Sequence, residues 1–231
     1  MSRMHQLTAL RHRGFRLLWM DTLFSSTARW ADVVVIGWLT LELTDSPLMV
    51  GIVAASKMAG YIAAPFMGVV ADRMDRRLLL IAAAGVNLAV SVTMLLLFVS
   101  GWLELWHVIA LALASSLTWA MDNPARQALV ADLVDTEDLT NAIALNAVAV
   151  EITVVVGPAL GGLLIPVLGT GGAYGLIAGL FLIDVLVLLR MQSAKHSAQP
   201  VHESPGRSLL GGLRYAWSNQ AVFMLLLIAF L

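Results

Sequence analysis

The chain contains no cysteine, which excludes disulfide bonds and thiolate metal sites. Charged side chains are also scarce: they make up 13% of the 231 residues, whereas a soluble domain carries roughly a quarter. A formal net charge of −1 argues against electrostatic binding of nucleic acid, so no nucleic-acid partner is expected. With 59% hydrophobic residues and a mean hydropathy of +0.85, much apolar surface must face something other than water, and a lipid bilayer is the expected environment.

Sequence patterns of enzymes and cofactor sites are missing as well. The five histidines show neither an HExxH pattern nor paired spacing on a helix, so no metal site is expected. No GxxxxGK[ST] loop occurs, which argues against ATP binding, and no nucleophile–base constellation supports a membrane-embedded enzyme. We therefore predict a protein that is not an enzyme and that uses no cofactor.

Long apolar runs are what the chain has in abundance. A bilayer-spanning helix needs about 20 mostly apolar residues, and the short alternating segments of a membrane barrel are absent from the sequence. The pattern predicts an all-α integral membrane fold whose N-terminal bundle has six spanning helices. They are expected at 15–41, 48–70, 78–100, 105–121, 142–168 and 173–189.

The last apolar run, AVFMLLLIAFL at 221–231, covers about half a crossing. An unfinished span would leave backbone groups without partners in lipid, so we expect a piece of a longer protein; a short re-entrant or interfacial end is the alternative. The predicted organisation is a six-helix bundle at 1–190, a cytoplasmic linker with an amphipathic helix at 191–218, and a truncated seventh spanning helix at 219–231.

The Lys and Arg residues outside the cores of the predicted spans all fall on one side. The N-terminal segment holds four, the loops after the second and fourth spans hold three and one, and the segment after the sixth span holds four. Because cytoplasmic loops are enriched in positive residues, the N-terminus is predicted to be cytoplasmic, in a multi-pass protein of the plasma (inner) membrane.

A charged stretch, GVVADRMDRR at 68–77, separates the second and third predicted spans. It resembles the loop signature Gly-x-x-x-Asp-Arg-x-Gly-Arg-Arg/Lys of the major facilitator superfamily. The segment 123–146 is similar to the branch of that superfamily that includes enterobactin exporters and macrolide efflux proteins, and GPALGG at 157–162 is similar to the span-5 antiporter signature of facilitator exporters. The residues that match the loop signature are Gly68, Asp72, Arg73, Arg76 and Arg77, with Asp75 where the pattern usually has glycine.

The resemblance implies half of a facilitator-type transporter, in which two six-helix halves work by alternating access. It also implies that the charged loop is a cytoplasmic latch between the halves, whose arginines pair with acids after the fourth span; an orientation anchor alone is the alternative. The expected latch partners are Asp122, Arg126 and Asp132. Many proton-driven facilitator exporters carry an arginine in the fourth span, whereas here Arg126 is expected in the loop just after it.

Small residues and a proline mark the fifth span. Small residues allow membrane helices to approach closely, and proline removes a backbone hydrogen bond and bends the helix. We expect either a functional kink, which controls the side on which a central cavity is sealed, or ordinary small-residue packing. The residues concerned are Gly157, Pro158, Gly161 and Gly162.

Ionisable residues deep in a span cost about 2.5–3.5 kcal/mol each, so each needs a reason. Asp21, Arg29 and Asp32 fall on one polar stripe of the first span, within about 80° of a helical wheel. Arg29 and Asp32 are predicted to pair within the helix, and Lys57 and Glu151 could complete a neutral set across the cavity. Protonation of Asp32 or Glu151 would then couple protons to conformation; a purely structural network of salt bridges is the alternative.

The functional prediction follows from these features. We expect a secondary active transporter that exports a small amphiphilic molecule, drug-like or siderophore-like, by proton antiport. Its partners would be that substrate, protons, the lipid bilayer and the missing C-terminal half of the polypeptide. Uptake or flipping of a lipid-like or other organic solute is the alternative, and a non-transporting membrane scaffold is the alternative from another class. Asp184, near the end of the sixth span, is expected to snorkel without a specific role.

Overall fold

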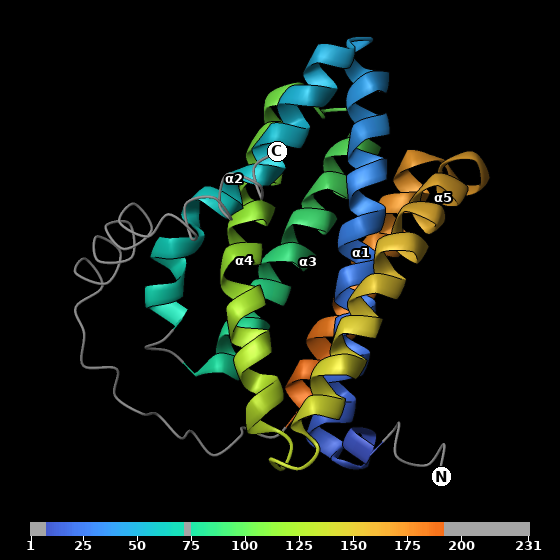
Figure 1. Cartoon of the computed structure of the whole chain (residues 1–231). Helices are drawn as coiled ribbons and strands as arrows, with labels where there is room; N and C mark the ends of the chain where they lie inside the picture. Colours follow the sequence, from blue (N-terminus) through green and yellow to red (C-terminus); the bar gives the residue numbers. More distant parts are fainter. Residues whose placement is uncertain (1–7, 72–74, 192–231) are drawn as a thin grey trace, which may run out of the picture. The chain divides into compact units, whose positions relative to one another are not determined.

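The computed structural model describes residues 8–71 and 75–191, with only the backbone path given for residue 61 and residues 63–71. Apart from a short 3₁₀ turn at 8–11, every element in this part of the chain is an α-helix (Figure 1). The helices are α1 (Arg13–Thr44), α2 (Pro47–Ala71), α3 (Arg76–Ser100), α4 (Leu105–Asp132) and α5 (Leu139–Arg190). The all-α prediction is thus confirmed for the described residues. The predicted linker at 191–218 and seventh span at 219–231 lie outside them, apart from Met191.

Local chemistry explains where α3 begins and ends. The Asp75 carboxylate accepts hydrogen bonds from the backbone N–H groups of Arg77, at 2.9 Å, and Leu78, at 3.1 Å, which satisfies donors that the first helical turn leaves unpaired. At the other end Gly101 adopts φ 73°, a left-handed conformation that glycine takes at low steric cost. Its N–H closes the helix on the carbonyl groups of the last turn.

The fifth helix is too long for a single membrane crossing. Its 52 residues would extend about 78 Å as one straight helix, against a hydrocarbon core about 30 Å thick. It is not straight, because Gly169 has φ 69° and ψ 173° and joins two helical segments across a kink. A φ and ψ of this kind are essentially restricted to glycine, which explains why the chain turns at this residue.

The two segments of α5 run in opposite directions (Figure 1). The Leu145 carbonyl accepts a hydrogen bond from the Trp19 indole near the start of α1, at 2.9 Å. Thr170, just after the kink, donates to Glu42 near the end of α1, also at 2.9 Å. Leu188 then returns to the apolar cluster that holds the first turns of α1. The segment after the kink therefore leads back to the level at which α5 began.

The predicted spans agree with the helices to different degrees. The first three predicted spans match α1, α2 and α3 within a few residues at each end. The predicted fourth span stops at 121, whereas α4 continues to Asp132. The loop prediction rested on the charges of Asp122 and Arg126, but both are buried among partners inside the helical bundle. The fifth and sixth predicted spans form α5, with Gly169 between them.

The surface of the bundle is apolar, as contact with lipid requires. In the described residues, α3, α4 and α5 are long and apolar enough to cross a membrane by length and composition. Large aliphatic side chains point outward from them, for example Val99, 72% exposed, and Val155, 71% exposed. The polar residues in the middle of α1 are turned inward instead: Asp21 and Ser25 are buried, while Trp30, on the face opposite Asp21, is 38% exposed.

Two apolar clusters form the core, one toward each end of the bundle. The first includes Val35, Met94 and Ile177, and the second includes Leu18 and Leu129. Along α1, α4 and α5, buried polar and charged residues lie between the positions that contribute to the two clusters. The fold therefore holds a polar layer enclosed by apolar packing on both sides.

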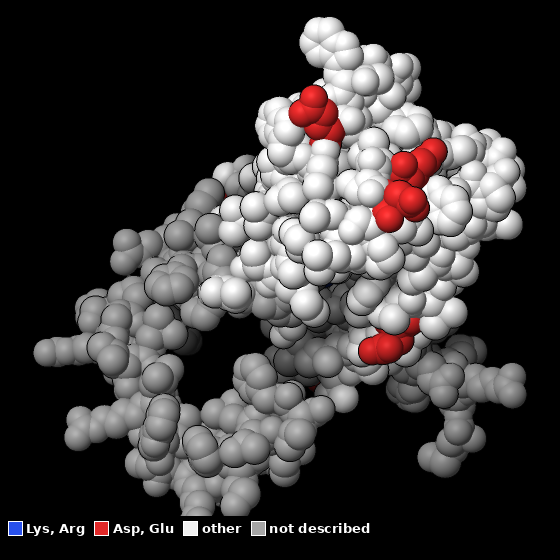
Figure 2. All heavy atoms as spheres, turned by 90° about the horizontal axis from the view of Figure 1, so that it is seen from above, with Lys and Arg blue, Asp and Glu red and all other residues white. Residues whose placement is uncertain are grey.

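The ends of the bundle differ in charge. Figure 2 views the end that carries the α1–α2 and α3–α4 connections, and its described surface shows acidic side chains but no Lys or Arg. The chain places Glu42, Asp45 and Glu104 at these connections. The described arginines of the chain termini and of the α2–α3 connection lie toward the opposite end.

Candidate functional site

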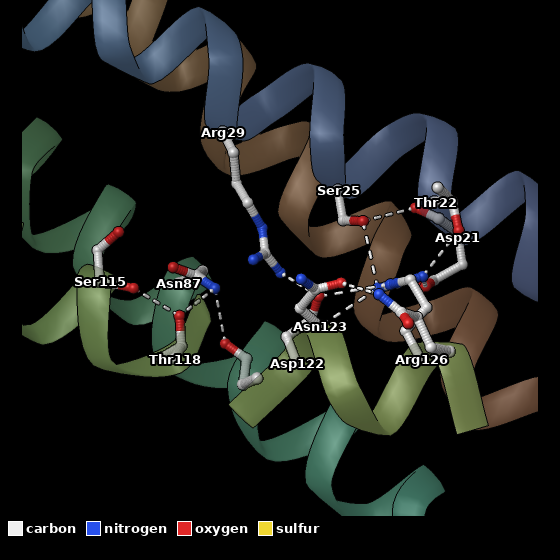
Figure 3. Close-up of polar contacts among 12 residues, drawn as sticks. Asp21, Thr22, Ser25, Arg29, Asn87, Ser115, Thr118, Asp122, Asn123 and Arg126 are labelled. Carbon is white, nitrogen blue, oxygen red and sulfur yellow. Dashed lines mark hydrogen bonds and ion pairs between the residues drawn. The ribbon is translucent and has the colours of Figure 1, made fainter. Parts of the chain in front are cut away.

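The candidate site is the charged part of the polar layer. Three helices contribute to it: α1 and α4 supply the acidic and basic side chains that Figure 3 shows. The returning segment of α5 supplies one further acid. We call these residues the ion network. Its members are Asp21, Arg29, Asp122, Arg126 and Asp184.

Arg126 lies at the centre of the ion network. Its guanidinium points from α4 toward α1, where Nη1 contacts Asp21 Oδ2 at 2.5 Å and donates to the Thr22 hydroxyl at 3.0 Å (Figure 3). Its Nη2 contacts Asp122 Oδ1, one turn away on the same helix, at 3.2 Å, and Ser25 Oγ at 3.5 Å. Arginine presents five donors in a rigid fork and keeps its charge. A residue that is 6% exposed can remain charged here because acids and hydroxyls surround it.

Asp122 joins the two arginines of the network. Its Oδ2 contacts Arg29 Nη2 at 3.0 Å, while Oδ1 faces Arg126. The predicted pairing of Arg29 with Asp32 inside α1 is therefore wrong. Arg29 instead reaches α4, where a carboxylate already lies within the polar layer, and the contact ties α1 to α4.

Asp32 pairs with Lys57, which connects α1 to α2. Both side chains are mostly buried, with 14% and 16% exposed, so the pair lies partly out of water. Glu151, which was predicted to join this set, is exposed on α5, and no ion pair of the described residues includes it. The sequence analysis placed Asp32 and Lys57 in one charged set but paired Asp32 with Arg29, and it placed Glu151 in that set although its side chain is exposed.

Asp184 was expected to snorkel, and this expectation is wrong. The residue is 1% exposed, and it faces Asp21, Arg126 and Asp122 rather than the membrane interface. Its signal in the sequence is a single acid in an otherwise apolar run, which alone does not reveal what it faces. The spacing of Asp122 and Arg126, four residues apart, was a visible helical pair.

The charged α2–α3 stretch makes two kinds of contact. Arg76 Nη1 contacts Asp132 Oδ2 at the end of α4, at 2.5 Å, as the sequence predicted for one latch candidate. Arg77 instead donates to the backbone carbonyls of Leu188, at 3.1 Å, and Leu189, at 2.9 Å, at the end of α5. These contacts tie the start of α3 to the ends of two neighbouring helices.

The other latch residues take different places. Asp122 faces Arg29 and Arg126 rather than the charged stretch. Gly68 lies in the part of α2 for which only the backbone is given, and Asp72 and Arg73 lie outside the described residues. Their roles stay predictions.

The glycines of the fifth predicted span lie against α1. A Cβ built on Gly157 would lie 2.4 Å from the Trp30 Cβ, and one on Gly161 would lie 2.7 Å from the Ala31 carbonyl oxygen. Gly162 has nothing within 4 Å, and Pro158 lies inside a segment with helical backbone angles, since the non-helical residue within α5 is Gly169. Close approach of two helices is therefore present, while a functional kink stays a prediction.

A solvent-open cleft of about 1070 Å³ lies elsewhere, between the end of α1 and the kink of α5. Its lining includes Trp38, Glu42, Phe98 and Pro166, and no member of the ion network. Within the described ranges, no group of three or more His, Asp and Glu side chains could hold a metal ion. Asp21, Asp122, Arg126 and Asp184 are each at most 6% exposed, so protein encloses this part of the ion network, and its side chains offer charge pairing and proton binding.

Comparison with known proteins gives a consistent picture. The family model described as transmembrane secretion effector matches residues 4–231. Curated relatives include the enterobactin exporter EntS of Shigella boydii serotype 18, 28% identical over 219 residues, which cover 91% of this chain and 51% of that protein. The same exporter of Shigella flexneri is 27% identical over 226 residues, covering 94% and 53%, and that of Escherichia coli is 27% identical over 219 residues. The chain spans about half the length of the curated relatives it matches.

Proposed function

Because the chain belongs to the transmembrane secretion effector family of the major facilitator superfamily, we propose that it is the N-terminal half of a secondary active exporter. Family membership supports the prediction of a multi-pass membrane transporter that is not an enzyme. The proposed cargo is a small amphiphilic molecule, because the similar proteins are named as exporters of enterobactin. Alternating access between this half and a C-terminal half would move it across the plasma (inner) membrane.

The observation that carries this proposal is a buried ion network inside a bundle with an apolar exterior. Ionisable residues within membrane segments are expensive, and they commonly mark substrate, ion or proton pathways. A purely structural network would hold the helices in one arrangement, whereas a transporter uses interactions that can break and reform. The ion pair between Arg126 and Asp21, which connects α4 to α1, is an interaction of this kind.

We further propose six crossings with a cytoplasmic N-terminus. The reversal of α5 at Gly169 supports two crossings for that helix, one on each side of the kink. The described face in Figure 2 shows no Lys or Arg, which supports placing that end of the bundle on the non-cytoplasmic side of the membrane. The arginines of the opposite end, including Arg76 and Arg77, would then lie in the cytoplasm.

The charged α2–α3 stretch is proposed to act as a cytoplasmic latch. The pair of Arg76 with Asp132 and the bonds from Arg77 to the end of α5 support a role in holding three helix ends together. In a complete transporter the same cluster would contact the C-terminal half while the protein faces outward. If the stretch is only an anchor that sets orientation, replacing the acids that its arginines contact with neutral residues should leave transport intact.

The proposal is tested by expressing the full-length protein in cells and measuring accumulation of ethidium, a fluorescent amphiphilic cation, and of enterobactin. An exporter lowers accumulation relative to cells with an empty vector, and a protonophore abolishes the difference. Accumulation that rises with expression would favour uptake instead. Glu137→Gln is a suitable control, since Glu137 is exposed in the α4–α5 connection, and Asp32→Asn tests the pair with Lys57. Membrane insertion of each variant is measured in parallel.

A further inference from the structure

The contact between Asp184 and Asp21 is the least expected feature of the polar layer. The two carboxyl groups face each other across α1 and the returning segment of α5. Asp21 is fully buried and Asp184 is 1% exposed. Neither Asp21 Oδ1 nor Asp184 Oδ1 has a hydrogen-bond partner among the described residues. Ionised carboxylates only accept hydrogen bonds, so two of them in contact away from water repel each other.

The charges of the ion network do not balance. It contains three carboxyl groups and two guanidinium groups, which leaves one negative charge in excess if every acid is ionised. Arginine stays protonated in proteins, so the excess can be removed only at a carboxyl group. A buried unpaired charge is costly, and uptake of one proton makes the network neutral.

The hydrogen bonds indicate which carboxyl groups share that proton. Asp122 contacts a guanidinium through each of its oxygens, since Arg126 faces Oδ1 and Arg29 faces Oδ2. Asp21 contacts Arg126 through Oδ2 only. Asp184 is in no ion pair of the described residues. A proton between Asp184 and Asp21 would supply the missing donor for the two unsatisfied oxygens.

Charged groups on the neighbouring helices do not change this balance. On α1, Arg13 and Arg16 are exposed, and Asp32 pairs with Lys57. On α4 the next ion is Asp132, which pairs with Arg76. On α3, Arg77 donates to backbone carbonyls at the end of α5. The remaining charges of α5 lie apart from the network: Glu151 is exposed, and Arg190 is in the last turn.

We propose that Asp184, together with Asp21, binds the proton that the transport cycle takes up and releases. This rests on the proposed function for its role in transport, but the proton site itself rests on burial and charge alone. When the proton leaves, both carboxyl groups are negative, and the two arginines, Arg29 and Arg126, face three ionised carboxylates. Repulsion between Asp21 and Asp184 then favours separation of α1 from the end of α5. The proton thus biases two arrangements of the bundle.

A sodium ion is the other small cation that could neutralise the site. It would need several oxygen ligands around one point, as other hard cations do. Within residues 8–71 and 75–191 as described, no three acidic or histidine side chains are arranged so that they could hold a metal ion, so sodium would have to take most of its ligands from hydroxyl and carbonyl oxygens. Two facing carboxyl oxygens suit a single proton, so the proposal commits to that ligand.

Infrared spectroscopy of the full-length protein in lipid vesicles tests the site without a substrate. A protonated carboxyl group has a carbonyl stretch that an ionised one lacks, and we expect this band in the wild type at neutral pH. Asp184→Asn, which mimics the neutral acid in size and charge, should lose the component of the band due to this site. Asp184→Glu should keep a band at a shifted frequency, and this variant assigns the site even if the amide impairs assembly.

The control and the contrary outcomes are distinct. Glu137→Gln, in the exposed α4–α5 connection, should leave the band unchanged. A band that persists unshifted in both variants of Asp184 overturns the proposal, as does a band lost in Asp32→Asn or Glu151→Gln and kept in Asp184→Asn. The proposal is also overturned, in favour of sodium, by two results together. The wild type would show no band, and NaCl would stabilise it against heat more than choline chloride does, an effect that Asp184→Asn abolishes.

Transport measured in the same vesicles separates this inference from the proposed function. With an imposed pH gradient, the wild type should accumulate ethidium, and Asp184→Asn should exchange ethidium across the membrane without gradient-driven accumulation. If the wild type shows the band but no gradient-driven transport, the proposed function fails while the proton site stands. If the wild type and Asp184→Asn both accumulate ethidium with the gradient, Asp184 is not the coupling residue, and the proposed function stands.

Discussion

Gly161 offers a sharp test of how α5 packs on α1. In Gly161→Ala the new Cβ would lie 2.7 Å from the Ala31 carbonyl oxygen and 3.2 Å from its Cα. Ordinary contact begins near 3.4 Å, so the shortfall is about 0.7 Å. These atoms belong to the backbone and cannot rotate away. The two helices must move apart, and overpacking of this kind costs about 1–3 kcal/mol.

The neighbouring glycine provides a matched control. Gly162 lies on the same helix with nothing within 4 Å of its Cβ position, so Gly162→Ala adds a methyl group to open space. Both variants gain up to about 1 kcal/mol of helix propensity, and this gain cancels in their difference. We therefore expect Gly161→Ala to be about 1–3 kcal/mol less stable than Gly162→Ala.

The assay is denaturant unfolding of the full-length protein in detergent micelles, followed by tryptophan fluorescence. The free energy of unfolding of each variant is compared with that of the wild type at one temperature. Equal stabilities for the two alanine variants would refute the reasoning, because the close approach of Gly161 to Ala31 would then have no energetic consequence.

Three further predictions concern charged contacts. Arg126→Gln should lower the free energy of unfolding by about 3–5 kcal/mol, because it leaves buried carboxylates without their main partner; a value below about 1 kcal/mol would contradict this. The reversal Arg76→Asp should cost at most about 1 kcal/mol of stability, since the pair is partly exposed, but should reduce ethidium efflux if the latch exists. Combining Arg76→Asp with Asp132→Arg should restore that efflux, and failure to restore it would argue against pairing of these two residues. Hydrogen bonds, first from the His12 ring, lower the pKa of Asp138, so this contact stabilises the fold above the ordinary carboxylate pKa and loses its effect as pH falls through the lowered value. Thermal melts against pH should show an acid-side loss that Asp138→Asn lacks.

The helices themselves could be predicted well from the sequence. The apolar runs that became α1, α2 and α3 are bounded by charges or turn residues, such as Asp75 and Gly101, whose capping chemistry is local. The inward orientation of the stripe that holds Asp21 also followed from spacing alone, because a helix repeats every 3.6 residues. Local chemistry and periodicity are both present in the sequence of a single segment.

The partners of the charges could not be predicted in the same way. Asp122 and Arg126 indicated a loop because charge usually marks water, and only contacts from α1 make that part of α4 a buried helix. Asp184 is far from Asp21 in the sequence, so their contact depends on the reversal of α5 at Gly169. Pairing across helices is a property of the tertiary fold, and single-segment patterns do not contain it.

The central claim is that this chain is half of a proton-coupled exporter. The most direct measurement uses the full-length protein in sealed vesicles with an imposed pH gradient, with ethidium flux and proton flux recorded together. The account predicts that ethidium moves against its own gradient while protons move the opposite way, and that both fluxes stop when the pH gradient is collapsed. Ethidium transport that is indifferent to the gradient and moves no protons would contradict it.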